Sequence, residues 1–444
     1  MLKSRERGLF ELYADDPERG DSLVFGRISQ VGRRGFIKGA GLATMGTMVG
    51  GAIPFSGDMP TGLFPAALAQ AAGDAKSPQI LKMDGKAGLV ILGDKPLVAE
   101  TPAHMLDDDI TPIDKFFIRN NGLVPEQAAN ADGWMITVDG EVNAPMKISV
   151  GELKKKFPVV SYKLQMECGG NGRSAFVPEA RGNQWTNGAI GNAEWSGVRL
   201  RDVLQAAGLK SSATFTGHYG ADPHLSGDPA RPSISRGVPI AKAMEEHTLI
   251  AFAINGQPIP NIHGFPARLI VPGWPGSTSQ KWLTRIWVRD QEHDGQGMAD
   301  ASYRVPIIPM VPGDKHDPKN MRILESMPVR SIITNVAHGT RLAKGTRSVA
   351  LRGHAWAGEK TVRAVHVSKD FGSTWQECSV SAPANKYCWQ NWSTTVQLPT
   401  AGYYEFFVRA TDSDGNSQTH AAANWNPQGY GGNVFHRIAA LVEA

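Results

Sequence analysis

The pattern of this 444-residue chain changes at residues 309–313, Pro-Met-Val-Pro-Gly, and this change constrains the fold more than any other feature. Before it, strand patterns are interspersed with short helical patterns, whereas after it no helical pattern is found. The later apolar runs read as strands separated by turn residues, at residues 349–355, 361–368, 394–398 and 403–410. Several short strands in a row predict an immunoglobulin-like β-sandwich at residues 320–444.

Residues 99–312 have the pattern of a mixed α/β domain. A capping box that begins at Ser149 predicts one helix, and the apolar spacing over residues 200–207 predicts a second. Gly140 follows an alternating run, so we expect a hairpin turn there that leads back into residues 141–142. The strands predicted in this part are residues 134–138, 249–254 and 282–288. The predicted fold class is therefore α+β, with a mixed α/β domain followed by a sandwich.

An export signal is predicted at residues 1–69. Twin arginines at residues 33–34 precede an uncharged stretch at 39–57, and Ala-Leu-Ala at 67–69 offers a cleavage site between small residues. The alternatives are a buried helix and a membrane span, but Pro54 breaks the stretch before the ~20 residues that a span needs.

Twin-arginine export carries proteins that are already folded, often around a cofactor. We therefore expect a periplasmic protein with a bound cofactor and no membrane span in the mature chain. Residues 70–98 are interpreted as a linker between the signal and the first domain.

Composition excludes several classes of protein. Lys and Arg number 46 against 42 Asp and Glu, and this net charge of +4 is too balanced to indicate a nucleic-acid-binding protein. Three cysteines exclude a disulfide scaffold and a multi-cysteine iron–sulfur or zinc site, and no motif for covalent haem attachment is present. Cys378 and Cys388 flank a predicted hairpin at residues 379–387, where a disulfide and two free thiols are the alternatives.

The chemically most informative segment is residues 167–173, Glu-Cys-Gly-Gly-Asn-Gly-Arg. Cys168 follows an apolar, strand-like run, and the glycines after it let backbone amides approach a bound group closely. Arg173 offers a bidentate contact to an oxyanion or a phosphate. From these residues alone, a reactive thiolate and a small buried core cysteine are equally supported.

This segment resembles the element Cys-Ala-Gly-Asn-Arg-Arg of the sulfite oxidase family of molybdenum enzymes. Four further segments match that family in the same order, so the resemblance covers roughly residues 99–440. They are Phe-Phe-Ile-Arg-Asn at 116–120, His-Gly-Phe-Pro-Ala-Arg at 263–268 with Val-Pro-Gly at 271–273, Ser-Gln-Lys-Trp-Leu at 279–283, and Trp-Asn at 425–426 with His-Arg at 436–437. Five motifs in order make a chance agreement improbable.

The resemblance implies a molybdenum–molybdopterin cofactor whose metal is bound by the thiolate of Cys168. It also implies that His263, Arg268 and Lys281, with backbone amides at residues 117–120, hold the pterin and its phosphate. The full set of cofactor-binding residues implied by the resemblance is Phe117, Arg119, Asn120, Asn121, Cys168, Asp222, His263, Arg268, Ser279, Gln280 and Lys281.

In this family the cofactor donates an oxygen atom to a sulfur lone pair, water restores the oxygen, and two electrons leave one at a time. The protein must hold an electron-rich sulfur with preorganised positive charge, and the resemblance implies Arg119 and Arg173 for this role. Trp185 is expected to wall the pocket, with a plain core tryptophan as the alternative. Tyr303 stands near the position of the family's active-site tyrosine, although the residues before it differ from the family pattern.

Three departures from the family pattern bear on the substrate. Gly172 stands where the family has an arginine, Asn121 where it usually has a histidine, and Gln428 where animal sulfite oxidases have an arginine. Each removes charge or a donor, and the glycine is expected to open space for a sulfur atom delivered on a tether. The pattern resembles the sulfane dehydrogenase branch of the family, which oxidises a sulfane sulfur on a carrier protein during thiosulfate oxidation. Replacing Gly172 with arginine is then expected to favour free sulfite.

The electrons must leave on another protein, because the chain has no haem-attachment motif and no room for a cytochrome b5-like domain. The resemblance implies a c-type cytochrome subunit as acceptor, a sulfur-carrier protein as substrate, and a homodimer or heterotetramer assembled through the sandwich. The rival hypotheses are a sulfite dehydrogenase that acts on free sulfite and a non-catalytic adhesion module built on the sandwich.

Overall fold

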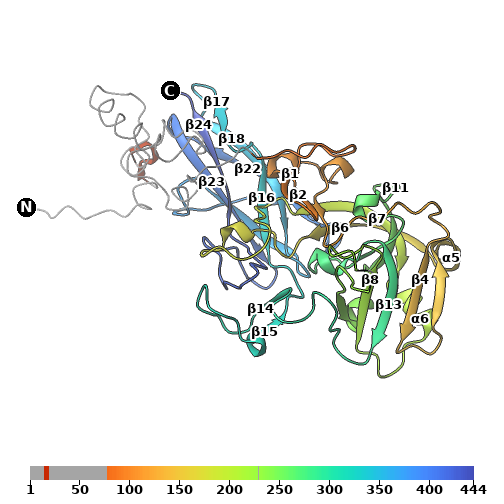
Figure 1. Ribbon diagram of the computed structural model, residues 1–444. Helices are drawn as coiled ribbons and strands as arrows, with labels where there is room; N and C mark the ends of the chain where they lie inside the picture. Colours follow the sequence, from red (N-terminus) through yellow and green to blue (C-terminus); the bar gives the residue numbers. More distant parts are fainter. Residues whose placement is uncertain (1–14, 20–77, 229) are drawn as a thin grey trace, which may run out of the picture.

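The computed structural model describes residues 15–19, 78–228 and 230–444, and residues 78–228 with 230–444 form two β-rich domains in contact with each other (Figure 1). The twin-arginine segment and its cleavage site lie outside these described residues, so the export signal stays a prediction. In the part of the chain that is described, no helix is both long and apolar enough to cross a membrane.

Two five-stranded sheets and three short helices build most of the first domain. One sheet has the order β5 (Met146–Ser149), β4 (Met135–Gly140), β13 (Leu283–Arg289), β8 (Phe215–Gly220) and β9 (Gly237–Pro239). The other has the order β11 (Gln257–Pro258), β10 (Leu249–Ile254), β7 (Ile190–Arg199) and β6 (Val159–Glu167), with β12 (Arg268–Ile270) paired to β10. The helices are α5 (Val150–Lys156), α6 (Leu200–Ala207) and α7 (Ile240–Ala243).

Local sequence explains where the helices begin and end. The Ser149 hydroxyl accepts a hydrogen bond from the Glu152 amide, and the Glu152 carboxylate accepts one from the Ser149 amide, so the predicted capping box is confirmed. Helix α6 ends at Gly208, whose φ of 69° lies in the left-handed region that favours glycine. Its buried face consists of Leu200, Val203, Leu204 and Ala207.

The predicted hairpin at Gly140 is wrong. Strand β4 continues through Gly140, which pairs with Val288 of β13, and the antiparallel return strand is β5. Gly140 is needed instead for close packing, because a Cβ there would overlap the backbone of Val288.

The predicted linker is also partly a folded element. Residues 90–98 belong to β1 (Val90–Asp94) and the start of β2 (Leu97–Glu100), which form a small sheet with β3 (Ile118–Arg119). Leu89 and Ile118 are buried in a cluster beneath this sheet. The apolar contacts, which the sequence pattern did not indicate, attach this segment to the first domain.

The second domain is a sandwich of two sheets, as predicted. One has the order β16 (Arg330–Asn335), β18 (Ser348–Trp356), β22 (Gln390–Gln397) and β21 (Ser379–Val380). The other has the order β17 (Thr340–Leu342), β24 (His436–Val442), β23 (Gly402–Asp412), β19 (Val362–Ser368) and β20 (Gln376–Glu377). A hairpin of β14 (Arg304–Pro306) and β15 (Met321–Ile323) connects the two domains.

The cysteines of the sandwich are free thiols. Strands β21 and β22 pair as an antiparallel hairpin in which Ser379 faces Ser393. Cys378 therefore lies next to Thr394, whereas Cys388 comes before β22 and contacts the side chain of Asn192. The hairpin register, rather than the distance along the chain, excludes the disulfide.

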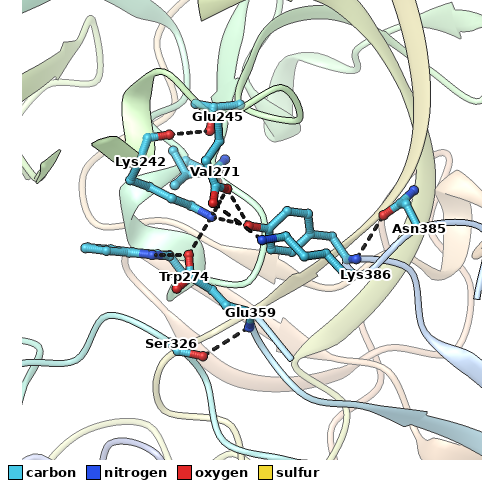
Figure 2. Close-up of polar contacts among 11 residues, drawn as sticks. Lys242, Glu245, Val271, Trp274, Ser326, Glu359, Asn385 and Lys386 are labelled. Atoms are coloured by element: carbon cyan, nitrogen blue, oxygen red, sulfur yellow. Dashed lines mark hydrogen bonds and ion pairs between the residues drawn. The ribbon is translucent and has the colours of Figure 1, made fainter. Parts of the chain in front are cut away.

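A buried lysine joins the two domains (Figure 2). The ammonium of Lys242 in α7 lies 2.7 Å from a carboxylate oxygen of Glu245 and 2.8 Å from one of Glu359. It also donates to the hydroxyl of Tyr387 at 2.8 Å. Glu359 is held in turn by the indole of Trp274 at 3.0 Å. Because Glu359 and Tyr387 belong to the sandwich, this network fixes how the domains meet.

Candidate active site

One cavity brings together segments from the whole first domain. It is lined by all eleven residues that the sequence analysis assigned to the cofactor and by Tyr303. The lining residues are Phe116, Phe117, Arg119, Asn120, Asn121, Met166, Cys168, Asp222, Ile234, His263, Arg268, Gly276, Ser277, Ser279, Gln280, Lys281, Trp282 and Tyr303.

Cys168 reaches this cavity because it follows directly on β6. Strand β6 pairs with β7 over its whole length, and the Cys168 amide donates to the backbone oxygen of Ala189 at 2.9 Å. The Asn171 amide then donates to the Cys168 oxygen at 2.9 Å and closes a tight turn. The thiol is thus held at the end of a rigid sheet rather than on a loose loop.

Three cations gather in the same cavity region without a carboxylate at ion-pair distance among the described residues. Arg268 donates to the backbone oxygens of His263 at 2.8 Å and Ser279 at 2.9 Å. Lys281 donates to the backbone oxygen of Ile262 at 2.8 Å and to the side-chain oxygen of Asn120. Lys86 places its ammonium 2.6 Å from a ring nitrogen of His263. Their hydrogen-bond partners are neutral, so among the described residues no ion pair compensates the positive charge.

Burial makes these charges costly in the absence of an anion. It lowers the pKa of Lys86 from 10.5 to about 7 and the pKa of Arg268 to about 9. Burial and the nearby charge of Arg268 hold the pKa of Lys281 well below its ordinary value. Burial and the nearby charge of Lys86 also hold the pKa of His263 well below its ordinary value. A bound anion would relieve this cost, so the cavity is suited to a negatively charged group.

Arg119 and Asp222 complete the polar lining. The guanidinium of Arg119 donates to the backbone oxygen of Asn120 at the end of β3. The carboxylate of Asp222 accepts a hydrogen bond from the Ser233 hydroxyl, and burial raises its pKa. Asp222 is the only acidic residue among those that line the described cavity.

Comparisons with known proteins agree with this geometry. Residues 121–297 match the model of the oxidoreductase molybdopterin binding domain, and residues 321–443 match the Mo-co oxidoreductase dimerisation domain. Sulfite oxidase of Gallus gallus is 32% identical over 381 residues, which cover 83% of this chain and 81% of that protein. The chain belongs to the sulfite oxidase family. Mitochondrial sulfite oxidase of Rattus norvegicus is also 32% identical, and the match covers 80% of this chain and 66% of that enzyme.

The fold of the family is found in a solved structure as well. The crystal structure of the sulfane dehydrogenase SoxCD from Paracoccus pantotrophus superposes with a TM-score of 0.66 over 87% of this chain and 94% of that chain. The sequence identity of 23% makes this a likeness of fold. The family models and the sulfite oxidase relatives establish a molybdenum-dependent oxidoreductase with a molybdenum–molybdopterin cofactor.

The residues present fit this cofactor. Within the described residues, the side-chain amide nitrogen of Asn120 and the side-chain oxygen of Gln280 are buried in the cavity wall without a hydrogen-bond partner. They offer one donor and one acceptor to a pterin ring. Arg268, Lys281 and His263 would hold its phosphate, and the thiol of Cys168 would bind the metal. When bound, the group supplies two-electron oxygen-atom transfer.

Arg173 and Trp185 do not line the cavity. Arg173 donates to the backbone oxygens of Gln428 at 2.7 Å and Asn183 at 2.8 Å, so its guanidinium ties the Cys168 turn to the C-terminal segment. Trp185 is fully buried and packs edge-on against Phe117, with ring centroids 6.0 Å apart. Trp185 thus supports the cavity wall from behind. The catalytic roles expected for both residues stay predictions.

Tyr303 forms part of a stack that the sequence analysis missed. Its ring lies 4.7 Å from the ring of Tyr430, and the two are nearly parallel. The guanidinium of Arg236 lies over the ring of Tyr303 at 4.4 Å, and that of Arg173 over the ring of Tyr430 at 5.3 Å. Neither Arg236 nor Lys86 belongs to a motif, so no local signal could have identified them.

The departures from the family pattern have different positions. Asn121 lines the cavity, whereas Gln428 contributes a backbone oxygen to Arg173 outside it. Gly172 has a φ of 83°, and a Cβ there would overlap the guanidinium of Arg330 from the sandwich. The interpretation that Gly172 opens space for a tethered sulfur is wrong, because the glycine faces the domain interface.

Proposed function

We propose that this chain oxidises a reduced sulfur centre in the bacterial periplasm and passes the electrons to a separate c-type cytochrome. The observation that carries the proposal is the single cavity in which Cys168 meets Arg119 and the unpaired cations Arg268 and Lys281. Such a cavity suits an anionic cofactor together with an electron-rich sulfur substrate. The twin arginines at residues 33–34 support export to the periplasm.

Each turnover inserts one oxygen atom from water into the sulfur substrate and releases two protons and two electrons, so sulfite becomes sulfate in one turnover and a sulfane sulfur becomes a sulfonate in three. The chain's own task is to bind and orient the sulfur in a water-poor site. Arg119 and Tyr303 line the cavity and are the side chains available to contact the substrate. Because fixed charges need no reorganisation during the reaction, Arg119 stabilises negative charge on the substrate oxygens.

The first candidate substrate is a sulfane sulfur carried by a partner protein in thiosulfate oxidation. Asn121 in the cavity wall supports this candidate, since it replaces the histidine usual in the family. Exposed apolar side chains also follow Tyr303 along the chain, at Ile307, Ile308 and Val311. Ile307 is held in place by a hydrogen bond from its amide to the Asn320 oxygen at 2.8 Å. An ordered, exposed apolar tip is a feature of surfaces that dock another protein.

The second candidate substrate is free sulfite. The positive charge of Arg119 in the cavity wall favours a small anion, and relatives that are 32% identical are sulfite oxidases.

Kinetics on the purified, molybdenum-containing protein separate the two candidates. We expect a higher kcat/KM for a carrier-protein persulfide than for sulfite, with cytochrome c as acceptor and Cys168→Ser as the inactive control. Efficient oxidation of sulfite without oxidation of the carrier would make the enzyme a sulfite dehydrogenase. A protein that contains molybdenum but oxidises neither compound would refute the proposed function.

The oligomeric state and the export to the periplasm are tested in separate experiments. The match of residues 321–443 to a dimerisation domain supports a homodimer, or a heterotetramer with the cytochrome. Light scattering on the mature protein, alone and with the cytochrome, would show a monomeric mass if this assembly were wrong. Replacing the arginines at residues 33–34 with lysines should leave the protein in the cytoplasm.

A further inference from the structure

The carboxylate of Glu167 lies behind the metal-binding cysteine and faces the sandwich. Met166 and Cys168 line the cavity, and side chains alternate along an extended strand, so Glu167 between them points away from the cavity. Its carboxylate is buried there and meets two donors of the sandwich. The indole of Trp356 donates to Oε2 at 2.8 Å, and the Nε atom of Arg330 lies 3.4 Å from Oε1.

The pairing of β16 with β18 places these two donors next to each other. Arg330 begins β16 and Trp356 ends β18, and the two residues face each other in the register of the sheet. Both side chains are fully buried. A guanidinium and an indole N–H from neighbouring strands of the sandwich thus hold one carboxylate of the first domain.

The same guanidinium also holds the far end of the turn that carries Cys168. Nη1 of Arg330 donates to the backbone oxygen of Asn171 at 3.0 Å. The side-chain amide of Asn171 donates to Glu167 Oε1 at 2.9 Å, and its backbone amide donates to the Cys168 oxygen at 2.9 Å. Residues 167 and 171, on either side of the thiol, are therefore both held by one side chain of the sandwich.

A role in domain packing alone does not explain a buried charged pair at this position. The Lys242 network already joins the two domains, and apolar side chains of similar volume would fill this space without the cost of burying two charges. Apolar contacts have no preferred direction, whereas hydrogen bonds to a carboxylate and to a backbone oxygen do. The charged pair therefore fixes the orientation of the turn, which apolar contacts would leave variable.

We infer that Arg330 and Glu167 are positioning residues through which the sandwich sets the orientation of the metal-binding thiol. Neither residue lines the cavity, and both act through the backbone of residues 167–171. The inference goes beyond the proposed function, because it holds whichever sulfur compound is oxidised and requires only that Cys168 binds the metal.

The test removes both charges at once, because the loss of one alone would leave the other buried without a partner. The double variant Glu167→Gln with Arg330→Met is compared with Trp356→Phe, which removes only the indole donor. Lys242→Met is the matched control, since Lys242 also forms a buried ion pair across the domain interface, but its ion pairs involve no residue of the turn.

The molybdenum-loaded proteins are compared by their metal content, by the electron paramagnetic resonance spectrum of the reduced metal centre, and by kcat and KM measured separately. In the cofactor-free chain, alkylation of Cys168 by iodoacetamide is followed by peptide mass spectrometry, with the free thiols Cys378 and Cys388 as internal controls. The spectrum and the alkylation rate report on the thiol without any sulfur substrate, so this test does not depend on the proposed function.

We expect the double variant to give an altered spectrum, with kcat lowered about tenfold and KM changed by less than about twofold. Its Cys168 should be alkylated severalfold faster than in the wild type, whereas the rates of Cys378 and Cys388 should not change. Trp356→Phe should change the same quantities in the same direction by a smaller factor. Lys242→Met should have the spectrum and the Cys168 alkylation rate of the wild type.

Two outcomes would overturn the inference. The first is a wild-type spectrum with a wild-type alkylation rate of Cys168 in the double variant, or in Trp356→Phe if the double variant does not fold. The second is an equal change in Lys242→Met, which would assign the effect to a loosened domain interface. If no sulfur compound is oxidised but the spectrum and the alkylation rate change as expected, the proposed function fails and the positioning role stands.

Discussion

Cys168 and Cys378 show that burial alone does not define a metal-binding thiol. Each is 7% exposed, but Cys168 lines the cavity at the end of β6, whereas Cys378 lies in the apolar core of the sandwich. We expect Cys168→Ser to abolish turnover while the melting temperature stays near that of the wild type, because an alcohol is a poor ligand for a soft-metal site. Cys378→Ser, the matched control, should retain full activity. Sulfur oxidation by Cys168→Ser would contradict the assignment.

Because Lys86 is buried, we expect the free energy of unfolding of the cofactor-free protein to depend on pH. Its ammonium donates to the backbone oxygens of Ile113 and Phe116, at 2.6 and 2.8 Å, and burial lowers its pKa from 10.5 to about 7. Between these values the unfolded chain binds a proton that the folded chain lacks, so the free energy of unfolding rises with pH. This contribution is at most about 1.4 kcal/mol per pH unit.

Urea unfolding at pH 7 to about 9.5 checks this prediction, because the slope that Lys86 contributes should be missing from Lys86→Met. The cofactor-loaded protein should show a flatter slope than the cofactor-free protein, since a nearby phosphate favours the charged lysine. Identical slopes for the wild type and Lys86→Met would show that Lys86 does not titrate in this range.

At the scale of elements, the turn after β6 requires glycine at position 172. Gly172 and Gly345 have nearly the same φ, 83° and 82°. Nothing lies within 4 Å of a Cβ built on Gly345, whereas one on Gly172 would overlap Arg330. We expect Gly345→Ala to cost about 1 kcal/mol of stability, and Gly172→Ala about 2 kcal/mol more.

Urea unfolding of the two alanine variants measures this difference. Gly172→Arg should then give a poorly folded protein rather than an enzyme that prefers sulfite, because the larger side chain has no room at the domain interface. A stable Gly172→Arg variant with raised sulfite activity would contradict this account of the turn.

At the scale of the whole molecule, the interface between the domains depends on Lys242 (Figure 2). Its side chain is 4% exposed, and removing it would leave Glu245 with only Lys386 at 3.5 Å and Glu359 with no cation at ion-pair distance among the described residues. We expect Lys242→Met to lower the free energy of unfolding by about 2 kcal/mol. Lys360, which pairs with Asp414 on the surface at 2.6 Å, is the control, and Lys360→Met should cost less than about 1 kcal/mol.

Calorimetry distinguishes a weakened interface between the two domains from a weakened first domain. If Lys242 stabilises the contact between the domains, its loss should separate the unfolding of the first domain from that of the sandwich. Equal effects of Lys242→Met and Lys360→Met would show that the buried network contributes no more than a surface ion pair.

The sequence by itself determined the elements that have local signals. The capping box at Ser149, the glycine stop after α6 and the strands of the sandwich were predicted because they depend on neighbouring residues. The ordered motifs also identified the family and a set of cofactor residues that share one cavity. Motifs that lie far apart in the sequence can be assigned to one site only when the family is already known.

Tertiary structure alone decided which distant groups meet and which charges stay unpaired. Strand register placed Cys378 beside Thr394, and domain packing placed Arg330 against Gly172. Folding also buried Lys86 and Arg236 next to cavity residues, although neither belongs to a motif. These features depend on burial and on contacts between segments far apart in the chain, and a charge costs free energy only where the fold removes its water and supplies no partner.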